Sequence, residues 1–325
     1  MSRVLVTGAS GFIGRRLLPV LVAGGHSVVA ATRRPEALGD LGTEVVLLNL
    51  ADRKTFAALP RDVDVVVHAA ARRLDSEKNW DGIVEMVRVN TLGTLNMLEY
   101  SESCGIKRFV YCSTMSVYAL PQPVPIREDG PTYPAQGLDS FYGISKLGGE
   151  LVCARLQQEG RLACQCLRLG RVYGPEESPQ SLLSLWVREA SEGKEIVVYS
   201  DGERSLDFIY IDDVIRGIIA AIESNWAGGV LNLGSGVETT WRRLAEAIVE
   251  VFSPPDSPAP VRYVPTGNRT RCYLDISQAR TALGFVPRYS LKDGLLDWRA
   301  SKFARTSGQL VKQHGSSVSG IQRDD

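Results

Sequence analysis

The sequence has little of the chemistry that metal sites and disulfide frameworks need. It contains only three histidines, which argues against a zinc site or a histidine-based catalytic triad, and we expect no metal. Its six cysteines are scattered and form no C-x-x-C pair, so they are predicted to be reduced, small apolar side chains. Net charge is absent as well, because 37 Lys and Arg residues balance 37 Asp and Glu residues. That balance excludes a general electrostatic attraction to nucleic acid.

Long apolar runs are also missing. The existing runs fall well short of the roughly 18 residues that span a bilayer. The first residues, MSRVLVTG, enter a strand pattern directly, without the architecture of a secretory signal. Both features predict a cytoplasmic protein that does not associate with membranes. The chain has 325 residues, 44% of them hydrophobic, which is ordinary globular composition and enough for about two domains.

Strand and helix patterns alternate through the first 170 residues, which predicts an α/β fold with a parallel, doubly wound sheet. The expected strands are Arg3–Thr7, Ser27–Thr32, Glu44–Leu48, Val63–His68, Arg108–Ser113 and Leu162–Leu169. The expected helices are Phe12–Ala23, Asp81–Cys104 and Ser140–Gln158 and, after the rhythm changes at Pro175, Ser181–Glu192, Asp212–Ser224 and Thr240–Phe252.

A glycine-rich turn, VTGASGFIG, joins the first predicted strand to the first helix. Gly8 permits the tight turn, Gly11 lets a pyrophosphate approach the backbone, and Gly14 allows the helix to pack closely on the strand. The free N–H groups and the positive dipole at the helix start would then hold the phosphates. The spacing is G-x-x-G-x-x-G, in the strand–turn–helix context that a dinucleotide site requires.

The end of the second strand indicates which dinucleotide is bound. NAD sites usually have an acidic residue there for the ribose 2′-hydroxyl, but this strand continues into Arg33, Arg34 and Pro35. A guanidinium can pair with a 2′-phosphate through charge-assisted hydrogen bonds. We therefore favour NADP, with NAD as the alternative if both arginines are ordinary surface charges.

A tyrosine and a lysine four residues apart begin the helix predicted over Ser140–Gln158. Tyr142 and Lys146 share one helix face, so the phenol and the ammonium are expected to point the same way. A phenol with a pKa of about 10 needs about 4 kcal/mol of preferential stabilisation to ionise near pH 7, and a neighbouring cation favours the phenolate. Ser113 and Thr114 end a predicted parallel strand, where ligands of such sheets bind. We expect Thr114 to orient a substrate oxygen while Tyr142 moves its proton.

With these motifs in place, the chain resembles the extended short-chain dehydrogenase/reductase family, in its NAD(P)-dependent epimerase/dehydratase group. Further matching motifs are VVHAAA, VN, YCSTMSVY, YGISK, LRLGRVYGP, DFIYIDDV, LNLGSG and LGFVP, and together they cover roughly residues 2–300. The resemblance implies a Rossmann-type dinucleotide-binding domain over 1–175 and a smaller α/β substrate-binding domain over 176–305. The tail over 306–325 is polar and is predicted to be mobile.

The resemblance also implies functional residues. It places the catalytic set on Thr114, Tyr142 and Lys146. The implied cofactor-binding residues are Gly8, Ser10, Gly11, Phe12, Ile13, Gly14, Arg33, Arg34, Leu50, Ala69, Ala70, Ala71, Asn90, Ser113, Tyr142 and Lys146. The implied substrate-binding residues are Ser113, Thr114, Arg171, Arg204 and Arg271. The substrate is expected to be a small molecule, and a homodimer is expected to form through the two long helices that match Asp81–Cys104 and Ser140–Gln158.

Departures from the family motifs narrow the chemistry. Met115 and Ser116 follow Thr114 where 4,6-dehydratases carry Asp-Glu, and Leu206 replaces an arginine that often precedes the Asp of DFIY. What remains is hydride and proton transfer at a carbinol or ketone carbon. The leading prediction is an NAD(P)-dependent nucleotide-sugar 4-epimerase or 4-ketoreductase. Two alternatives stay open: an NADPH-dependent reductase of a flavonoid-, steroid- or polyketide-like ketone, and a non-catalytic module that senses a dinucleotide.

Overall fold

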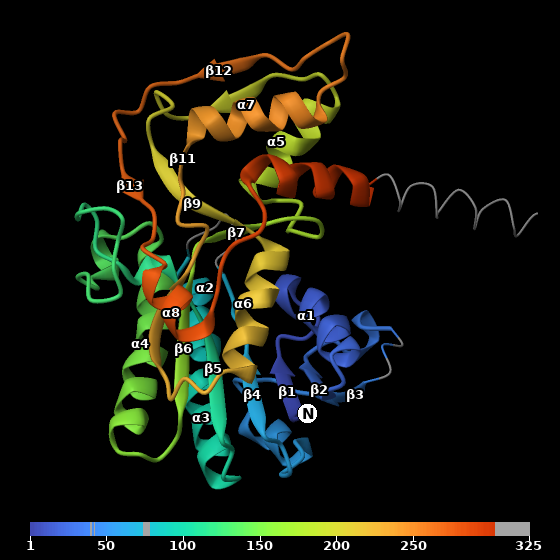
Figure 1. Ribbon diagram of the computed structural model, residues 1–325, viewed down its shortest axis with the longest axis vertical. Coiled ribbons are helices and arrows are strands. Elements are labelled where there is room, and N and C mark those ends of the chain that lie inside the picture. The colour runs from blue at the N-terminus through green and yellow to red at the C-terminus, as the bar shows by residue number, and fades with distance from the viewer. Residues whose placement is uncertain (40, 42, 74–78, 303–325) are drawn as a thin grey trace, which may run out of the picture.

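A computed structural model describes residues 1–39, 41, 43–73 and 79–302 of the chain. The predicted tail over 306–325 lies outside the described residues. Figure 1 shows a large sheet between two layers of helices, and a smaller part composed of short strands and helices beyond one end of that sheet. The strands of the large sheet run in parallel, so their carboxyl ends all meet the smaller part at that end.

The large sheet has seven strands in the order β10-β6-β5-β4-β1-β2-β3, and every pairing in it is parallel. The strands are β1 (Arg3–Thr7), β2 (Ser27–Thr32), β3 (Glu44–Leu47), β4 (Val65–His68), β5 (Arg108–Thr114), β6 (Cys164–Leu169) and β10 (Gly229–Leu233). The inner strands are buried on both faces, which explains why their sequences are almost continuously apolar.

Two apolar cores lie on the two faces of this sheet. Val4 and Val6 belong to one core and Leu5 to the other, because successive side chains of a strand point to opposite faces. The helices α1 (Phe12–Ala23), α6 (Ile211–Glu223) and α8 (Ser277–Leu283) cover the first face. The helices α2 (Trp80–Val87), α3 (Gly93–Ser103) and α4 (Ser140–Gln158) cover the second.

The smaller part has two sheets and its own helices. One sheet has the order β11-β9-β13, with β7 paired to β9, and the other pairs β12 with β8. Its elements are β7 (Arg171–Tyr173), β8 (Ile196–Val198), β9 (Ser205–Tyr210), β11 (Glu238–Thr240), β12 (Val261–Tyr263), β13 (Arg271–Cys272), α5 (Leu182–Ser191) and α7 (Trp241–Phe252), together with helical residues 291–302. Short 3₁₀ turns occur at Pro35–Ala37, Arg53–Ala58, Met115–Val117 and Pro134–Gln136.

The predicted α/β fold is confirmed, with one interruption that the sequence pattern did not reveal. The long helix expected over Asp81–Cys104 is α2 and α3 joined by a π-helical turn at Arg88–Leu92. The division at residues 175 and 176 stays a prediction, since β10 and α6 come after that point and pack with the large sheet. Across the described residues, no helix combines the length and apolar character that crossing a membrane requires.

Candidate active site

The glycine turn between β1 and α1 forms a close-fitting cradle. Gly8 has a positive φ of 69°, and a Cβ there would lie 2.7 Å from the backbone of Ala70. A Cβ at Gly14 would collide with the carbonyl oxygen of Gly8, so α1 packs closely on the turn. Gly11 caps α1 without a side-chain hydrogen bond, and the first turn of the helix has no acidic residue. The positive end of α1 therefore suits the pyrophosphate of a dinucleotide.

A cavity of about 650 Å³ opens above this turn, between the large sheet and the smaller part. Most of the predicted site residues line it. They are Gly8, Ser10, Gly11, Phe12, Ile13, Gly14, Arg33, Arg34, Leu50, Ala69, Ala70, Ala71, Ser113, Thr114, Tyr142, Arg171 and Arg204. Three predicted residues, all within the described chain, do not line the cavity: Asn90, Lys146 and Arg271.

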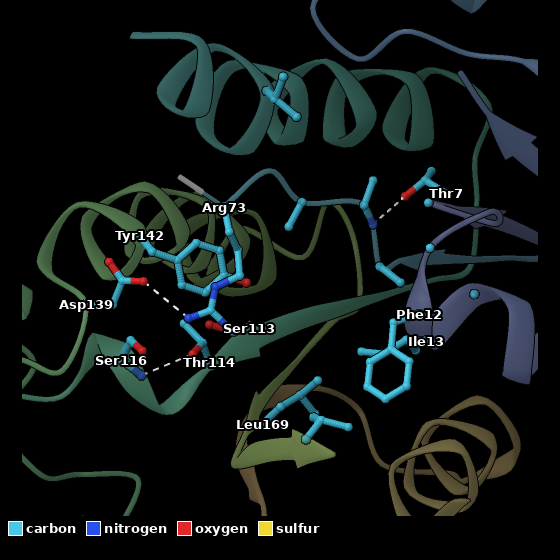
Figure 2. A pocket seen from close by; sticks show the side chains of 18 of the residues that line it. Thr7, Phe12, Ile13, Arg73, Ser113, Thr114, Ser116, Asp139, Tyr142 and Leu169 are labelled. Atoms are coloured by element: carbon cyan, nitrogen blue, oxygen red, sulfur yellow. Dashed lines mark hydrogen bonds and ion pairs between the residues drawn. The ribbon is translucent and has the colours of Figure 1, made fainter. Parts of the chain in front are cut away.

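The two hydroxyls at the end of β5 have different surroundings. The Ser113 hydroxyl donates to the buried carboxylate of Glu150, which turns it toward the protein interior. Thr114 ends the strand, and its Oγ1 accepts a hydrogen bond of 3.1 Å from the amide of Ser116. Figure 2 shows Thr114 and Tyr142 facing the same space. This arrangement favours Thr114 over Ser113 as the hydroxyl available to a substrate.

Tyr142 lies in the first turn of α4, and a cation contacts its ring. Burial raises the pKa of the Tyr142 phenol, and the nearby Arg73 opposes that effect. The guanidinium carbon of Arg73 lies 4.8 Å from the ring centre, and Arg73 is also paired with Asp139. Arg73 and Asp139 were not among the predicted site residues. Arg73 follows the carboxyl end of β4, where ligands of parallel sheets bind, and that position was the available signal.

Lys146 lies one helical turn after Tyr142 in α4 and contacts Tyr111 of β5. Its ammonium lies 4.2 Å from the centre of the Tyr111 ring and is buried. Burial lowers the pKa of Lys146 to about 8. Residues four apart lie on the same side of a helix, so the side of α4 that carries Tyr142 also carries Lys146.

Asn90 lies in the π-helical turn and fixes the chain that follows β4. Its side chain accepts from the amide of Arg72 at 2.7 Å, and donates to the Arg72 carbonyl at 2.8 Å and to the Ser145 hydroxyl at 2.9 Å. The neighbouring His68 is buried between the hydroxyls of Thr7 and Thr94. Burial, and to a smaller extent the charge of Lys146, hold the pKa of His68 well below its usual value.

The three predicted substrate arginines differ in their partners. Arg171 pairs with Glu177 at the cavity wall. Arg271 forms two hydrogen bonds of 2.6 Å with Glu238, which hold its guanidinium away from the cavity. The guanidinium of Arg204 lies 5.2 Å from the Trp241 ring centre. Its Nε and the indole Nε1 of Trp241 are buried donors that have no hydrogen-bond partner among the described residues.

Arg33 and Arg34 are exposed on the cavity wall after β2. The amide of Arg34 donates to the Thr32 hydroxyl at 3.1 Å, and that hydroxyl also bonds Ser10 of the glycine turn at 2.7 Å. The structure therefore holds this segment against the turn, at the end of the cavity where a dinucleotide has its adenosine ribose.

A phosphate cradle at one end of a cavity, and a phenol and a hydroxyl at the other, define a dinucleotide-dependent enzyme with a Rossmann-type fold. Its family follows from a family model that matches residues 4–234: the chain belongs to the NAD dependent epimerase/dehydratase family, an enzyme family of the extended short-chain dehydrogenase/reductase type.

Curated relatives and solved structures resemble the chain along almost its whole length. It is 30% identical to a UDP-glucose 4-epimerase of Mycolicibacterium smegmatis, over 94% of this chain and 100% of that protein. It is 28% identical to a dTDP-glucose 4,6-dehydratase of Streptomyces niveus, over 91% of both. Among solved structures, MoeE5 in complex with UDP-glucuronic acid and NAD matches with a TM-score of 0.80 and 29% identity, over 92% of this chain and 99% of that one.

Proposed function

We propose that this protein is an NAD-dependent nucleotide-sugar 4-epimerase, with Thr114 and Tyr142 as its catalytic pair. The observation that carries the proposal is that both side chains face one cavity, whose other end is the glycine turn. The similarity to a UDP-glucose 4-epimerase supports the reaction, and the similarity to MoeE5, whose complex holds UDP-glucuronic acid and NAD, supports the ligand class.

Side chains of this protein can carry out the proton transfer that the reaction requires. Thr114 would donate a hydrogen bond to the oxygen at the reacting carbon and hold it toward Tyr142. The Tyr142 phenolate would then take the hydroxyl proton, and return it when the configuration at that carbon has changed. NAD, when bound on the glycine turn, supplies the acceptor for the hydride. Lys146 is buried beneath this site and is proposed as a supporting cation rather than a proton carrier.

The two residues that follow Thr114 do not supply the acid and base that water elimination requires. The residues after Thr114 are Met115 and Ser116, and Met115 is buried in the core. Neither can act as the carboxylic acid and carboxylate pair that removes water from a sugar. Although the chain is similar to a 4,6-dehydratase, epimerisation fits these residues better.

Arg204 is the proposed anchor for the nucleotide diphosphate. Residues two apart on a strand point to the same face, so an arginine at 204 reaches the space that one at 206 would reach. Arg204 and Leu206 both line the cavity, as this alternation requires. The buried, unpartnered donors of Arg204 and Trp241 need acceptors, and phosphate oxygens supply them. Arg171 is proposed as a second contact.

The cofactor is proposed to be NAD, because the MoeE5 complex holds NAD. Arg33 and Arg34 nevertheless place positive charge where NADP carries its 2′-phosphate, so NADP is expected to bind as well. Calorimetric titration with each cofactor measures the preference. If NADP binds and NAD does not, the cofactor is NADP, as Arg33 and Arg34 after the second strand predicted.

A second copy of the chain is the proposed partner for the outer face of α2 and α4. Trp80, Val84 and Val87 recur at helical spacing along α2, and Ile144 and Leu151 do so along α4. All five are exposed, with Trp80 76% and Leu151 64% accessible, and α2 contacts α4. A continuous apolar face of this kind marks an interaction surface.

The experiment is an epimerisation assay with NAD and either UDP-glucose or UDP-glucuronic acid. The expected result is formation of the 4-epimer, resolved by NMR, without net change in absorbance of the reduced nicotinamide. Stoichiometric oxidation of NADPH by a non-nucleotide ketone would replace the proposal with ketone reduction. Dinucleotide binding without turnover of any substrate would favour a sensing module.

A further inference from the structure

Tyr142 lies beside a cation that is itself paired with an anion. The guanidinium carbon of Arg73 is 4.8 Å from the centre of the Tyr142 ring, and its Nη2 lies 3.2 Å from Oδ2 of Asp139. Asp139 immediately precedes α4 and lies three residues before Tyr142. Figure 2 shows the Arg73 side chain running along the Tyr142 ring to reach Asp139. Both charges therefore lie at the phenol, on the cavity wall.

Lys146, the other cation on this side of α4, has buried surroundings. Its ammonium contacts the ring of Tyr111, and Cys112, Glu150, Cys153 and Cys166 are the groups that favour its charged form. Lys146 is buried, whereas the side chain of Arg73 is 56% accessible and borders the cavity. Of these two cations, Arg73 is thus the one that lines the cavity together with Tyr142.

We propose that Arg73 and Asp139 are opposed positioning residues that set how much of Tyr142 is ionised at a given pH. The proposal rests on the acid–base function proposed for Tyr142. Arg73 favours the phenolate by direct charge interaction, and Asp139 cancels part of that effect because it pairs with Arg73 and repels the phenolate. A half-exposed ion pair contributes little to stability, so its effect on the phenol is the larger consequence of its position.

The charged and titratable groups around Tyr142 come from several segments of the chain. Arg73 follows β4, Asp139 directly precedes α4, Lys146 lies in α4, and Cys112 lies in β5. After burial, which raises the pKa of Tyr142, Arg73 lowers it, while Cys112 and Asp139 raise it. Burial raises the pKa of Cys112 itself to about 11, so the thiol is neutral near pH 7. Of the three side chains that shift this pKa besides burial, Arg73 and Asp139 then supply the charges near pH 7.

The two substitutions are expected to move the phenol in opposite directions. Arg73→Gln removes the attraction and should raise the pKa of Tyr142 by about half a pH unit, the size that Coulomb's law gives for a partly solvated charge near 5 Å. Asp139→Asn removes the opposing charge and should lower the pKa by a similar amount. Arg73→Lys keeps the charge and should restore a value near that of the wild type.

Ultraviolet titration of phenolate measures this directly in the full chain without substrate. The signal of each Tyr142→Phe counterpart is subtracted, so that only residue 142 contributes. Arg127→Gln, which breaks the exposed pair with Asp129, is the matched control and should leave the titration unchanged. Shifts of the same sign in Arg73→Gln and Asp139→Asn, or no shift in either, would overturn the proposal. Because no substrate is present, the result does not depend on the substrate having been identified correctly.

Discussion

At the scale of single residues, Tyr142 is the side chain whose loss tests the reaction. Tyr142→Phe keeps the ring but removes the group that carries the proton, so kcat should fall by at least ~10²-fold, the usual contribution of a positioned acid or base. Affinity for NAD should stay within about twofold, because the glycine turn is untouched. Steady-state rates and calorimetric titration measure the two quantities. Tyr133→Phe, at a tyrosine 57% exposed on the surface, is the control. Near-normal turnover in Tyr142→Phe would disprove the proton-transfer mechanism.

Arg204 and Arg271 were both predicted to bind substrate, but of the two only Arg204 lines the cavity, so their variants can be compared. Arg204→Gln should weaken binding of UDP by roughly 10- to 100-fold, the range for losing hydrogen bonds between charged groups. Arg271→Gln should leave UDP affinity unchanged, because its guanidinium pairs with Glu238 outside the cavity. Titration with UDP, which carries the diphosphate without the sugar, measures both. An equal loss in the two variants would mean that general surface charge, rather than the cavity, holds the diphosphate.

The sequence predicts a site residue well when the local backbone alone determines where that residue lies. Gly8 and Thr114 are predictable because each lies at or directly after the carboxyl end of a strand, and Tyr142 because it lies in the first turn of a helix. The contact of the Lys146 ammonium with Tyr111 was not predicted, because it depends on packing against β5. Trp241 was missed, since it reaches the cavity from a segment whose position depends on tertiary contacts, whereas Arg73 was missed although it follows the carboxyl end of β4.

At the scale of elements, the turn between β1 and α1 can be tested against a turn of similar backbone geometry. Gly8 and Gly160 have φ angles of 69° and 67°, but only at Gly8 would a Cβ meet other backbone. Gly160→Ala should therefore cost only the left-handed strain, about 1–2 kcal/mol. Gly8→Ala should cost more and should also abolish NAD binding.

Urea unfolding gives the two stabilities, and NAD titration gives the binding. The comparison separates backbone strain, which both variants share, from loss of the cradle. Equal stability losses with NAD affinity retained in Gly8→Ala would show that the turn tolerates a Cβ and does not shape the phosphate site.

Strands and helices of the large sheet were predicted well because their local patterns carry the signal. The bounds predicted for β1, α1, β2 and α4 match the structure, since buried parallel strands and amphipathic helices have distinct apolar periods. The π-helical turn at Arg88–Leu92 inserts one residue into a helical pattern, which changes the period too little to be seen. That turn is also what directs Asn90 toward Arg72.

At the scale of the whole molecule, the sequence predicted the layers but not the path of the chain between them. Parallel strands alternating with helices required helices on both faces of a sheet. The pairing of β10 with β6 joins residues about 60 positions apart, and the pairing of β7 with β9 removes β7 from the large sheet. Both pairings depend on tertiary packing, which a local pattern does not record. The pairing of β7 with β9 shapes the cavity, since Arg171 of β7 and Leu206 of β9 help to close its wall.

The proposed self-association is a property of the whole molecule, and one charge on the outer face of α4 should abolish it. Leu151→Glu places a carboxylate in the centre of a would-be apolar interface, where it loses its hydration without gaining a partner. Sedimentation analysis of the wild type should give twice the chain mass of 35.5 kDa, and Leu151→Glu should give the monomer.

Leu47→Glu is the matched control for that experiment. Leu47 is 55% exposed on β3, the strand at the opposite edge of the large sheet from β10, and Figure 1 shows β3 on the side away from α4. The same chemical change should therefore leave the dimer intact. Because Leu151 lies outside the cavity, the monomeric variant should still bind NAD. A monomeric wild type, or dissociation by Leu47→Glu alone, would refute α2 and α4 as the interface and leave their exposed apolar side chains without an assigned partner.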